Sequence, residues 1–147
     1  MKITPNEYSK MTEKASPNSK LWKDILLAFV SGGIICTIGQ VLLNVYMNLG
    51  LEKKDASTLV SVTLVALGAL LTALNVYDNI AKHAGAGTLV PITGFANSIV
   101  APAMEFKSEG HVMGIGAKMF VISGPVLVFG ITASIVYGII VWLFHLY

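Results

Sequence analysis

The sharpest candidate for chemistry in this 147-residue sequence is a lysine in an apolar setting. Lys118 lies in the stretch GIGAKMF, among small residues that leave room beside it. A lysine at the centre of a bilayer costs at least ~2.5–3.5 kcal/mol unless it reaches a headgroup or pairs with an opposite charge. Lys118 is therefore expected either to face an anion in a cavity, or to snorkel to the surface or pair with Glu105 or Glu109.

A second candidate site is the segment 83–104, HAGAGTLVPITGFANSIVAPAM, which has three glycines and two prolines but no Asp, Glu, Lys or Arg. We expect a broken or re-entrant helix here, which a membrane tolerates only where protein or a water-filled cavity covers it. Each half-helix would begin with free N–H groups that attract anions. The predicted substrate path comprises Thr88, Pro91, Thr93, Gly94, Asn97, Ser98 and Lys118. The same small residues also suit a tightly packed turn, and the spacing leaves both interpretations open.

The other reactive side chains do not predict an enzyme. His83, His111 and Asp78 flank apolar runs but lack the spacing of a metal site or a proton relay. Cys36 is the single cysteine, so one chain cannot form a thiolate cluster. No Ser-His-Asp order, phosphate loop or nucleic-acid-binding pattern is present. We therefore expect no catalytic residue, no metal, no cofactor and no nucleic-acid partner.

The elements that must position these residues are membrane-spanning helices. Hydrophobic residues make up 54% of the chain and charged residues 12%, about half the charge of a typical soluble domain. At 1.5 Å per residue, each stretch without Asp, Glu, Lys or Arg is long enough to cross a bilayer. These stretches are 25–51, 56–77, 83–104 and 119–147. The last is too long for one span, and Gly124-Pro125 is the expected helix break.

The predicted fold is an all-α, polytopic membrane helix bundle in which residues 22–147 form one transmembrane domain. Spans are expected at about 22–47, 57–77 and 125–146, with a broken or re-entrant region at 84–123. Residues 1–21 form a polar leader, expected to be solvated, with binding to anionic lipid or a cytosolic partner as the alternative. Lysines cluster in and just after this leader and none follows Lys118, which predicts a cytoplasmic N-terminus.

Small and polar residues in the first span predict close helix packing. Gly32, Gly33 and Gly39 would let another helix approach, and Gln40 could bond across the interface. The sequence also contains an echo, since LNVYMN (43–48) closes the first span and LNVYDN (74–79) closes the second. Chance similarity between apolar segments and an internal repeat both account for it.

Four ordered motifs resemble one known family. GGIICTIGQ (32–40), AGAGTLVPITGFANS (84–98), EFKSEG (105–110) and KMFVISGPVLVFG (118–130) are similar to the SpoVAC/SpoVAE membrane subunits of the SpoVA complex of spore-forming Firmicutes. The similarity extends from about Trp22 to Trp142. The EFKSEG turn, the following KMF…GPV and the long polar leader favour the AC type over the AE type.

The resemblance implies a role in moving dipicolinic acid, as its calcium chelate, across the spore inner membrane. It implies uptake during sporulation and release during germination, and partnership with an AE-type membrane subunit and the cytosolic AD subunit. The alternative is a non-conducting structural subunit that anchors a cytosolic dipicolinate-binding partner. The family has no agreed set of pore residues, so the path residues remain expectations from their types and positions.

Overall fold

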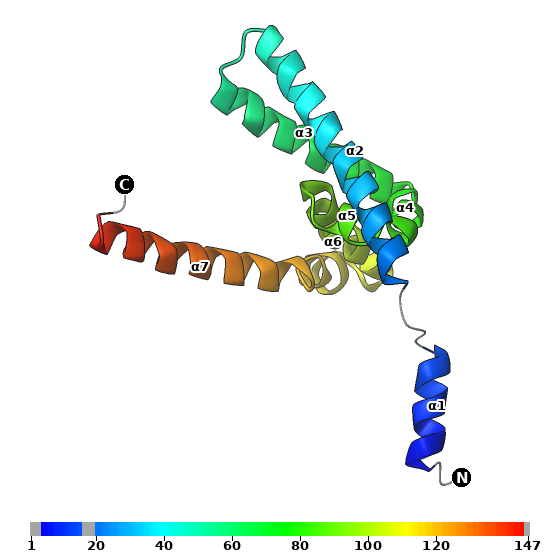
Figure 1. Cartoon of the computed structure of the whole chain (residues 1–147). Helices are drawn as coiled ribbons and strands as arrows, with labels where there is room; N and C mark the ends of the chain where they lie inside the picture. Colours follow the sequence, from blue (N-terminus) through cyan, green and yellow to red (C-terminus); the bar gives the residue numbers. More distant parts are fainter. Residues whose placement is uncertain (1–3, 16–19, 146–147) are drawn as a thin grey trace.

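The computed structural model describes residues 4–15 and 20–145, and every regular element in them is helical (Figure 1). The all-α fold is therefore confirmed. The elements are α1 (Pro5–Ala15), α2 (Leu21–Asn48), α3 (Lys53–Ala73), α4 (Tyr77–Ala84), α5 (Ala86–Leu89), α6 (Ile92–Glu105), η1 (Phe106–Glu109), η2 (His111–Gly116) and α7 (Ser123–Leu143). Residues 1–3 and 16–19 of the predicted leader, and residue 146 of the predicted last span, lie outside the described residues.

Three helices are long and apolar enough to cross a membrane, namely α2, α3 and α7. They contain 28, 21 and 21 residues, so at 1.5 Å per residue each reaches the ~30 Å of a hydrocarbon core. Helices α2 and α3 form an antiparallel hairpin, visible in Figure 1 as the blue, cyan and green pair. A 2.9 Å hydrogen bond between the hydroxyls of Tyr46 and Thr63 joins its two arms.

Helix α3 ends at Ala73, four residues before the end expected from the sequence. Asn75 has φ +56°, a left-handed conformation that asparagine adopts more readily than most residues. The chain then turns into the short helix α4, which begins at Tyr77. The echo segments thus differ in conformation: residues 43–48 are helical throughout, whereas residues 74–76 form a turn.

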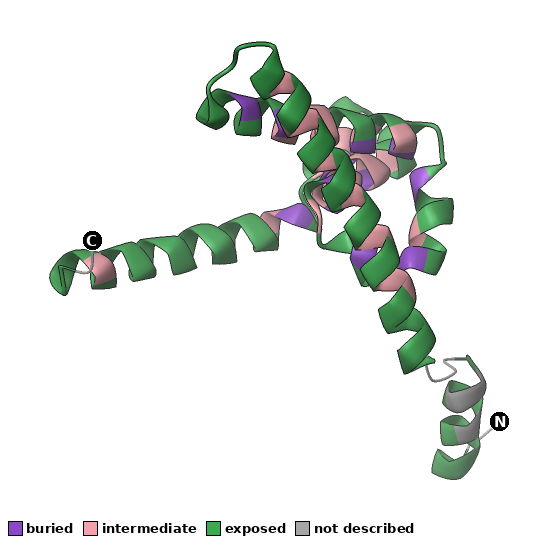
Figure 2. Ribbon diagram, turned by 45° about the horizontal axis from the view of Figure 1, so that its top comes forward, coloured by how far each residue is buried: buried purple, intermediate pink, exposed green. Residues whose placement is uncertain are grey.

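The Gly/Pro-rich segment consists of short helices. Gly85, at φ +52°, separates α4 from α5, a backbone conformation that favours glycine. Pro91 is extended at ψ 161° and precedes α6. We call residues 85–91, between α4 and α6, the break. Helix α5 packs on α2, and α6 packs along α3, so the hairpin covers the break from one side (Figure 2). Leu89 and Val90, at the end of α5, are exposed.

The chain between α6 and the last span is irregular and belongs to the predicted broken or re-entrant region 84–123. A 3-10 turn, η1, spans most of the EFKSEG motif, and Gly110 follows at φ +95°. The π-helical turn η2 comes next, and residues 119–122 form turns. Helix α7 starts at Ser123, so Pro125 lies in its first turn, where a missing N–H removes no helical hydrogen bond.

Helix α7 extends away from the other helices (Figures 1 and 2). Ser123 is buried at its start, yet residues 125–140 are all exposed. An apolar helix without neighbours over this length needs lipid or another protein around it.

The leader contains a helix, α1, that the sequence analysis did not predict. Thr4 donates its N–H and hydroxyl to the Glu7 carboxylate at 3.0 and 2.9 Å, and the Glu7 N–H donates to Thr4 Oγ1 at 3.4 Å. This is a capping box with proline at the first helical position. The donated backbone N–H, reinforced by the hydroxyl, holds the pKa of Glu7 below its usual value. The stretch TPNE was the signal that could have located it.

Candidate functional site: two cavities at the helix break

Tyr77 is the central side chain of the break. It is 4% exposed, and its hydroxyl lies 2.7 Å from the Thr88 carbonyl and 3.0 Å from Oγ1 of Thr93. The Thr88 carbonyl lies at the end of α5, ahead of Pro91, where the helical ladder stops. A buried carbonyl without a partner is costly, especially at membrane depth. Tyr77 thus supplies the hydrogen bond that the broken helix lacks.

Two cavities adjoin this tyrosine. The larger, about 270 Å³, lies between α2, α3 and the break, with an almost wholly apolar lining. The smaller, about 250 Å³, lies among α4, α5 and α6. Tyr77 and Thr88 line both cavities. Among the described residues that line them, none carries a charge.

A third, more polar cavity of about 440 Å³ lies between the end of α3, the start of α4 and the end of α6. Asp78, Glu105 and Asn75 line it together with Thr72. The Thr72 hydroxyl donates to Oδ1 of Asn97 at 2.8 Å, and Asn97 itself lines the 250 Å³ cavity. This bond therefore stands between the polar cavity and the break.

Glycines fix the shape of the break because helices touch there through backbone. A methyl group at Gly94 would collide with the carbonyl oxygens of Thr88 and Leu89. One at Gly87 would collide with Ser31 Oγ and the Ala28 carbonyl of α2. The close approach of α5 to α2, and of α6 to the end of α5, consequently requires glycine.

The structure brings together part of the predicted substrate path. Thr88, Thr93, Gly94 and Asn97 line one or both cavities of the break. Pro91 is the N-cap of α6 and lines neither cavity. Ser98 also lines neither, and its hydroxyl donates to the carbonyl of Phe95 at 2.7 Å within its own helix.

Lys118 lies apart from these residues. Its Nζ is 4.8 Å from the centroid of the Phe106 ring, a cation–π contact. It lines neither cavity of the break. This contact is closer to the expectation that Lys118 snorkels or pairs than to the expectation that it faces an anion in a cavity. Its partner, however, is an aromatic ring and not a headgroup or a carboxylate.

The residues predicted for helix packing separate into two pairs. Gly32 faces the backbone of Gly87, with 3.4 Å between the site of an added Cβ and the carbonyl oxygen, and Gly39 faces Leu64. Gly33 has open space beside it. Gln40 donates to Asn44 Oδ1 at 3.0 Å within the same helix, a bond inside α2 and not across a helix interface.

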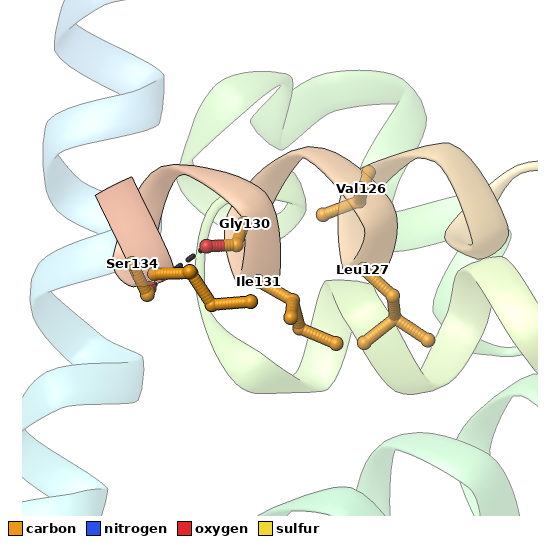
Figure 3. Close-up of a pocket in the computed structure, with 6 residues that line it drawn as sticks. Val126, Leu127, Gly130, Ile131 and Ser134 are labelled. Carbon is orange, nitrogen blue, oxygen red and sulfur yellow. Dashed lines mark hydrogen bonds between the residues drawn. The ribbon is translucent and has the colours of Figure 1, made fainter. Parts of the chain in front are cut away.

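A groove runs along the exposed helix α7, about 440 Å³ in volume (Figure 3). The small residues Gly130 and Ser134 line it together with larger side chains, among them Val126, Leu127 and Ile131. Gly138 continues the four-residue spacing of small residues, a pattern typical of close helix–helix contacts in membranes.

Metal-ligating side chains do not gather in the part of the chain that the structure describes, where no group of three His, Cys, Asp or Glu residues could hold an ion. His83 bonds through Nδ1 to the Asn79 carbonyl at 3.1 Å. Cys36 is exposed on α2.

Sequence reasoning missed Tyr77, the residue on which both cavities converge. The echo was the available signal. Tyr46 and Tyr77 occupy the same place in LNVYMN and LNVYDN, and each bonds through its hydroxyl to a threonine in a later helix, Thr63 or Thr93.

Comparison with known proteins identifies the family. The sequence pattern described as "SpoVAC/SpoVAEB sporulation membrane protein" matches residues 24–140, a range that holds the hairpin, the break and most of α7. The chain belongs to the SpoVAC/SpoVAEB family. It is 41% identical over 144 residues to stage V sporulation protein AC of Bacillus subtilis (strain 168), covering 97% of this chain and 95% of that protein. No solved structure matches this SpoVAC/SpoVAEB chain.

Proposed function

We propose that the chain is a pore-lining membrane subunit of a SpoVA complex that moves dipicolinic acid, with calcium, across the spore inner membrane. Movement is inward during sporulation and outward during germination, and the role is transport, not catalysis. The observation that carries the proposal is the pair of cavities at the helix break, in a chain of this sporulation family. Broken helices near the middle of a membrane protein are where transporters place their substrates.

The path runs along the break. It includes Thr88, Thr93, Gly94 and Asn97, whose hydroxyl, amide and backbone groups lie at or beside the two cavities. The Asn97 amide offers N–H groups to a carboxylate or a pyridine nitrogen, while the apolar wall from α2 and α3 suits a flat aromatic ring.

The complex is a hetero-oligomer in which the path is completed between subunits. Within the described chain α7 packs only at its start, and the groove at Gly130 and Ser134 is open. We assign this helix to contact with an AE-type membrane subunit, and the cytoplasmic side of the chain to the AD subunit that binds dipicolinate.

Flux through lipid vesicles tests the proposal. Vesicles holding the chain with its partner membrane subunit should release loaded dipicolinate, measured by terbium luminescence outside. Asn97→Leu, which keeps the branched shape of the side chain, should reduce release because it removes the polar amide from the path. It leaves the Thr72 hydroxyl bonded to the Gly68 carbonyl at 2.8 Å. Gln40→Leu, at an exposed position on α2, is the control and should leave release unchanged.

The competing proposal is a scaffold that seats the AD subunit while another subunit conducts. The uncharged lining of both cavities favours it, since a dianion gains no opposite charge from this chain there. The scaffold predicts wild-type release from vesicles with Asn97→Leu, and the pore predicts loss.

Orientation needs its own measurement. With a cytoplasmic leader, cysteines introduced at Lys10 and Lys54 on a Cys36→Ser background should label from opposite sides of the membrane, because α2 crosses it once between them. Labelling of position 10 from outside would contradict the cytoplasmic leader, and labelling of both positions from the same side would contradict a single crossing by α2.

A further inference from the structure

The two cavities at the break share one wall. Tyr77 and Thr88 are the only described residues that line both. At about 270 and 250 Å³, each lies below the ~300 Å³ at which ligand pockets ordinarily begin. Joined, they fall within the range of sites for small organic molecules. The residue that divides them therefore decides whether the break has room for cargo.

Of the two shared residues, Tyr77 is the one that can move. Thr88 is held at its carbonyl by the close approach of Gly94, and its hydroxyl donates to the Gly85 carbonyl at 3.1 Å. The Tyr77 ring is attached by two rotatable bonds and held at its far end by the hydroxyl, at 2.7 and 3.0 Å from its two partners. Rotation of this side chain would exchange these two hydrogen bonds.

We infer that Tyr77 is the barrier residue of the path: with its hydroxyl on Thr88 and Thr93 it separates the cavities, and its rotation joins them into one. The inference rests on the proposed function for its cargo, but not for its geometry. In the open position the Thr88 carbonyl and Thr93 hydroxyl face the joined cavity, where water or a polar group of the passing solute takes the place of the phenol. The same two groups thus hold the barrier shut and receive cargo.

Tyr46 provides a matched control. It too is a tyrosine whose hydroxyl bonds to a threonine, Thr63, across two helices at 2.9 Å. It lines neither cavity at the break. Loss of the Tyr46 hydroxyl costs a comparable bond between helices without touching the barrier.

Cysteine accessibility tests the barrier directly, on the full chain in lipid vesicles with Cys36→Ser. Asn97→Cys reports the α4–α5–α6 cavity and Ile35→Cys reports the cavity toward α2. With Tyr77 present, a small charged thiol reagent should modify position 97 faster than position 35. Tyr77→Ala should raise the rate at position 35 to near that at position 97. An unchanged rate at position 35, whether fast or slow, overturns the inference.

Tyr77→Phe separates the barrier from folding, because it keeps the ring and removes the hydroxyl. Loss of two bonds of modest net strength should raise the open fraction, and the rate at position 35, about tenfold, equivalent to about 1.4 kcal/mol. Tyr46→Phe should leave that rate within twofold at equal helix content and protein level. Equal effects of the two substitutions would mean that Tyr77 acts only in packing.

Dipicolinate release from the same vesicles, with the partner subunit included, distinguishes the two proposals. Faster release with Tyr77→Phe and unchanged release with Tyr46→Phe support both. If position 35 opens on Tyr77→Ala but no variant or wild type releases dipicolinate, the barrier stands and the cargo assignment fails. If the wild type releases dipicolinate but the modification rate at position 35 does not change on Tyr77→Ala, the cargo assignment is supported and the barrier role of Tyr77 is refuted.

Discussion

Replacing Gly94 by alanine is expected to destabilise the helix break more than any comparable glycine substitution in α7. The added methyl group would overlap the carbonyl oxygens of both Thr88 and Leu89. These are backbone atoms, so α6 must shift away from α5 to relieve the overlap. Overpacking of this kind costs about 1–3 kcal/mol. It is partly offset by the better helix propensity of alanine, which is worth up to ~1 kcal/mol.

Gly130 gives the matched control because nothing lies within 4 Å of an added Cβ there. Both glycines are helical, so the propensity gain is similar and the difference between the variants measures the contact. In detergent, with the chain alone, Gly94→Ala should lower the midpoint of thermal unfolding by several degrees, at roughly 3 °C per kcal/mol for a chain of this size. Gly130→Ala should hold or raise it. A Gly94→Ala protein that melts with or above the Gly130→Ala protein would refute the close approach of α6 to α5.

Three further outcomes are expected. Lys118→Gln should lower the unfolding midpoint as much as Phe106→Leu, since each removes the same cation–π contact, worth about 0.5–2 kcal/mol. The double variant should add little, and a Lys118→Gln effect on dipicolinate flux at unchanged stability would return this lysine to the path. For α1, the pKa of Glu7 is lowered in the folded helix by the Thr4 N–H. The stabilisation is thus present above the ordinary glutamate pKa and is lost as pH falls through the lowered value. Circular dichroism of the full chain should show helix loss over this acid range, and Glu7→Gln should remove that part of the dependence. Gly130→Leu, which fills the groove on α7, should reduce recovery of the partner membrane subunit on affinity purification without changing this chain's own amount, and undiminished recovery would exclude the groove as the contact.

The spans were predictable because charge and hydropathy report the membrane directly. The charge-free stretch 25–51 covers most of α2, and the charge-free stretch 119–147 contains α7. The ends were less accurate where local backbone decides. Asn75 takes a left-handed conformation and stops α3 early, inside an apolar run whose composition continues to Tyr77. Composition cannot show such a turn, since asparagine is also tolerated within helices.

The position of the cavities was predictable from the sequence, but the central residue of the candidate site was not. Glycine and proline between residues 83 and 104 indicate a break, and four of the seven predicted path residues line its cavities. Tyr77 precedes that segment in the chain and reaches it only through the fold. Lys118 attracted attention as a charge in an apolar setting, but the partner that the structure gives it, Phe106, is an aromatic residue without charge. The spacing of residues along the chain does not show that Lys118 and Phe106 are in contact in the fold.

Under the proposed function, the uncharged lining of the break decides in which form dipicolinate would cross. A free dicarboxylate would carry two negative charges into cavities that contain hydroxyl, amide and backbone groups but no cation from the described chain. Desolvating such charges without opposite charges is strongly unfavourable. A one-to-one chelate with calcium is neutral, and its remaining polar atoms match hydroxyl and carbonyl partners.

We therefore expect vesicles with this chain and its partner membrane subunit to release dipicolinate faster when loaded with the calcium chelate than with the sodium salt at equal concentration. The advantage should persist in Lys118→Gln, because that side chain lines neither cavity. Equal release of both forms would mean that the partner subunit supplies the cation for the path. Slower release of the chelate would mean that dipicolinate crosses outside these uncharged cavities. A route that favours the free dianion over the neutral chelate must supply positive charge, and the described residues that line these cavities supply none.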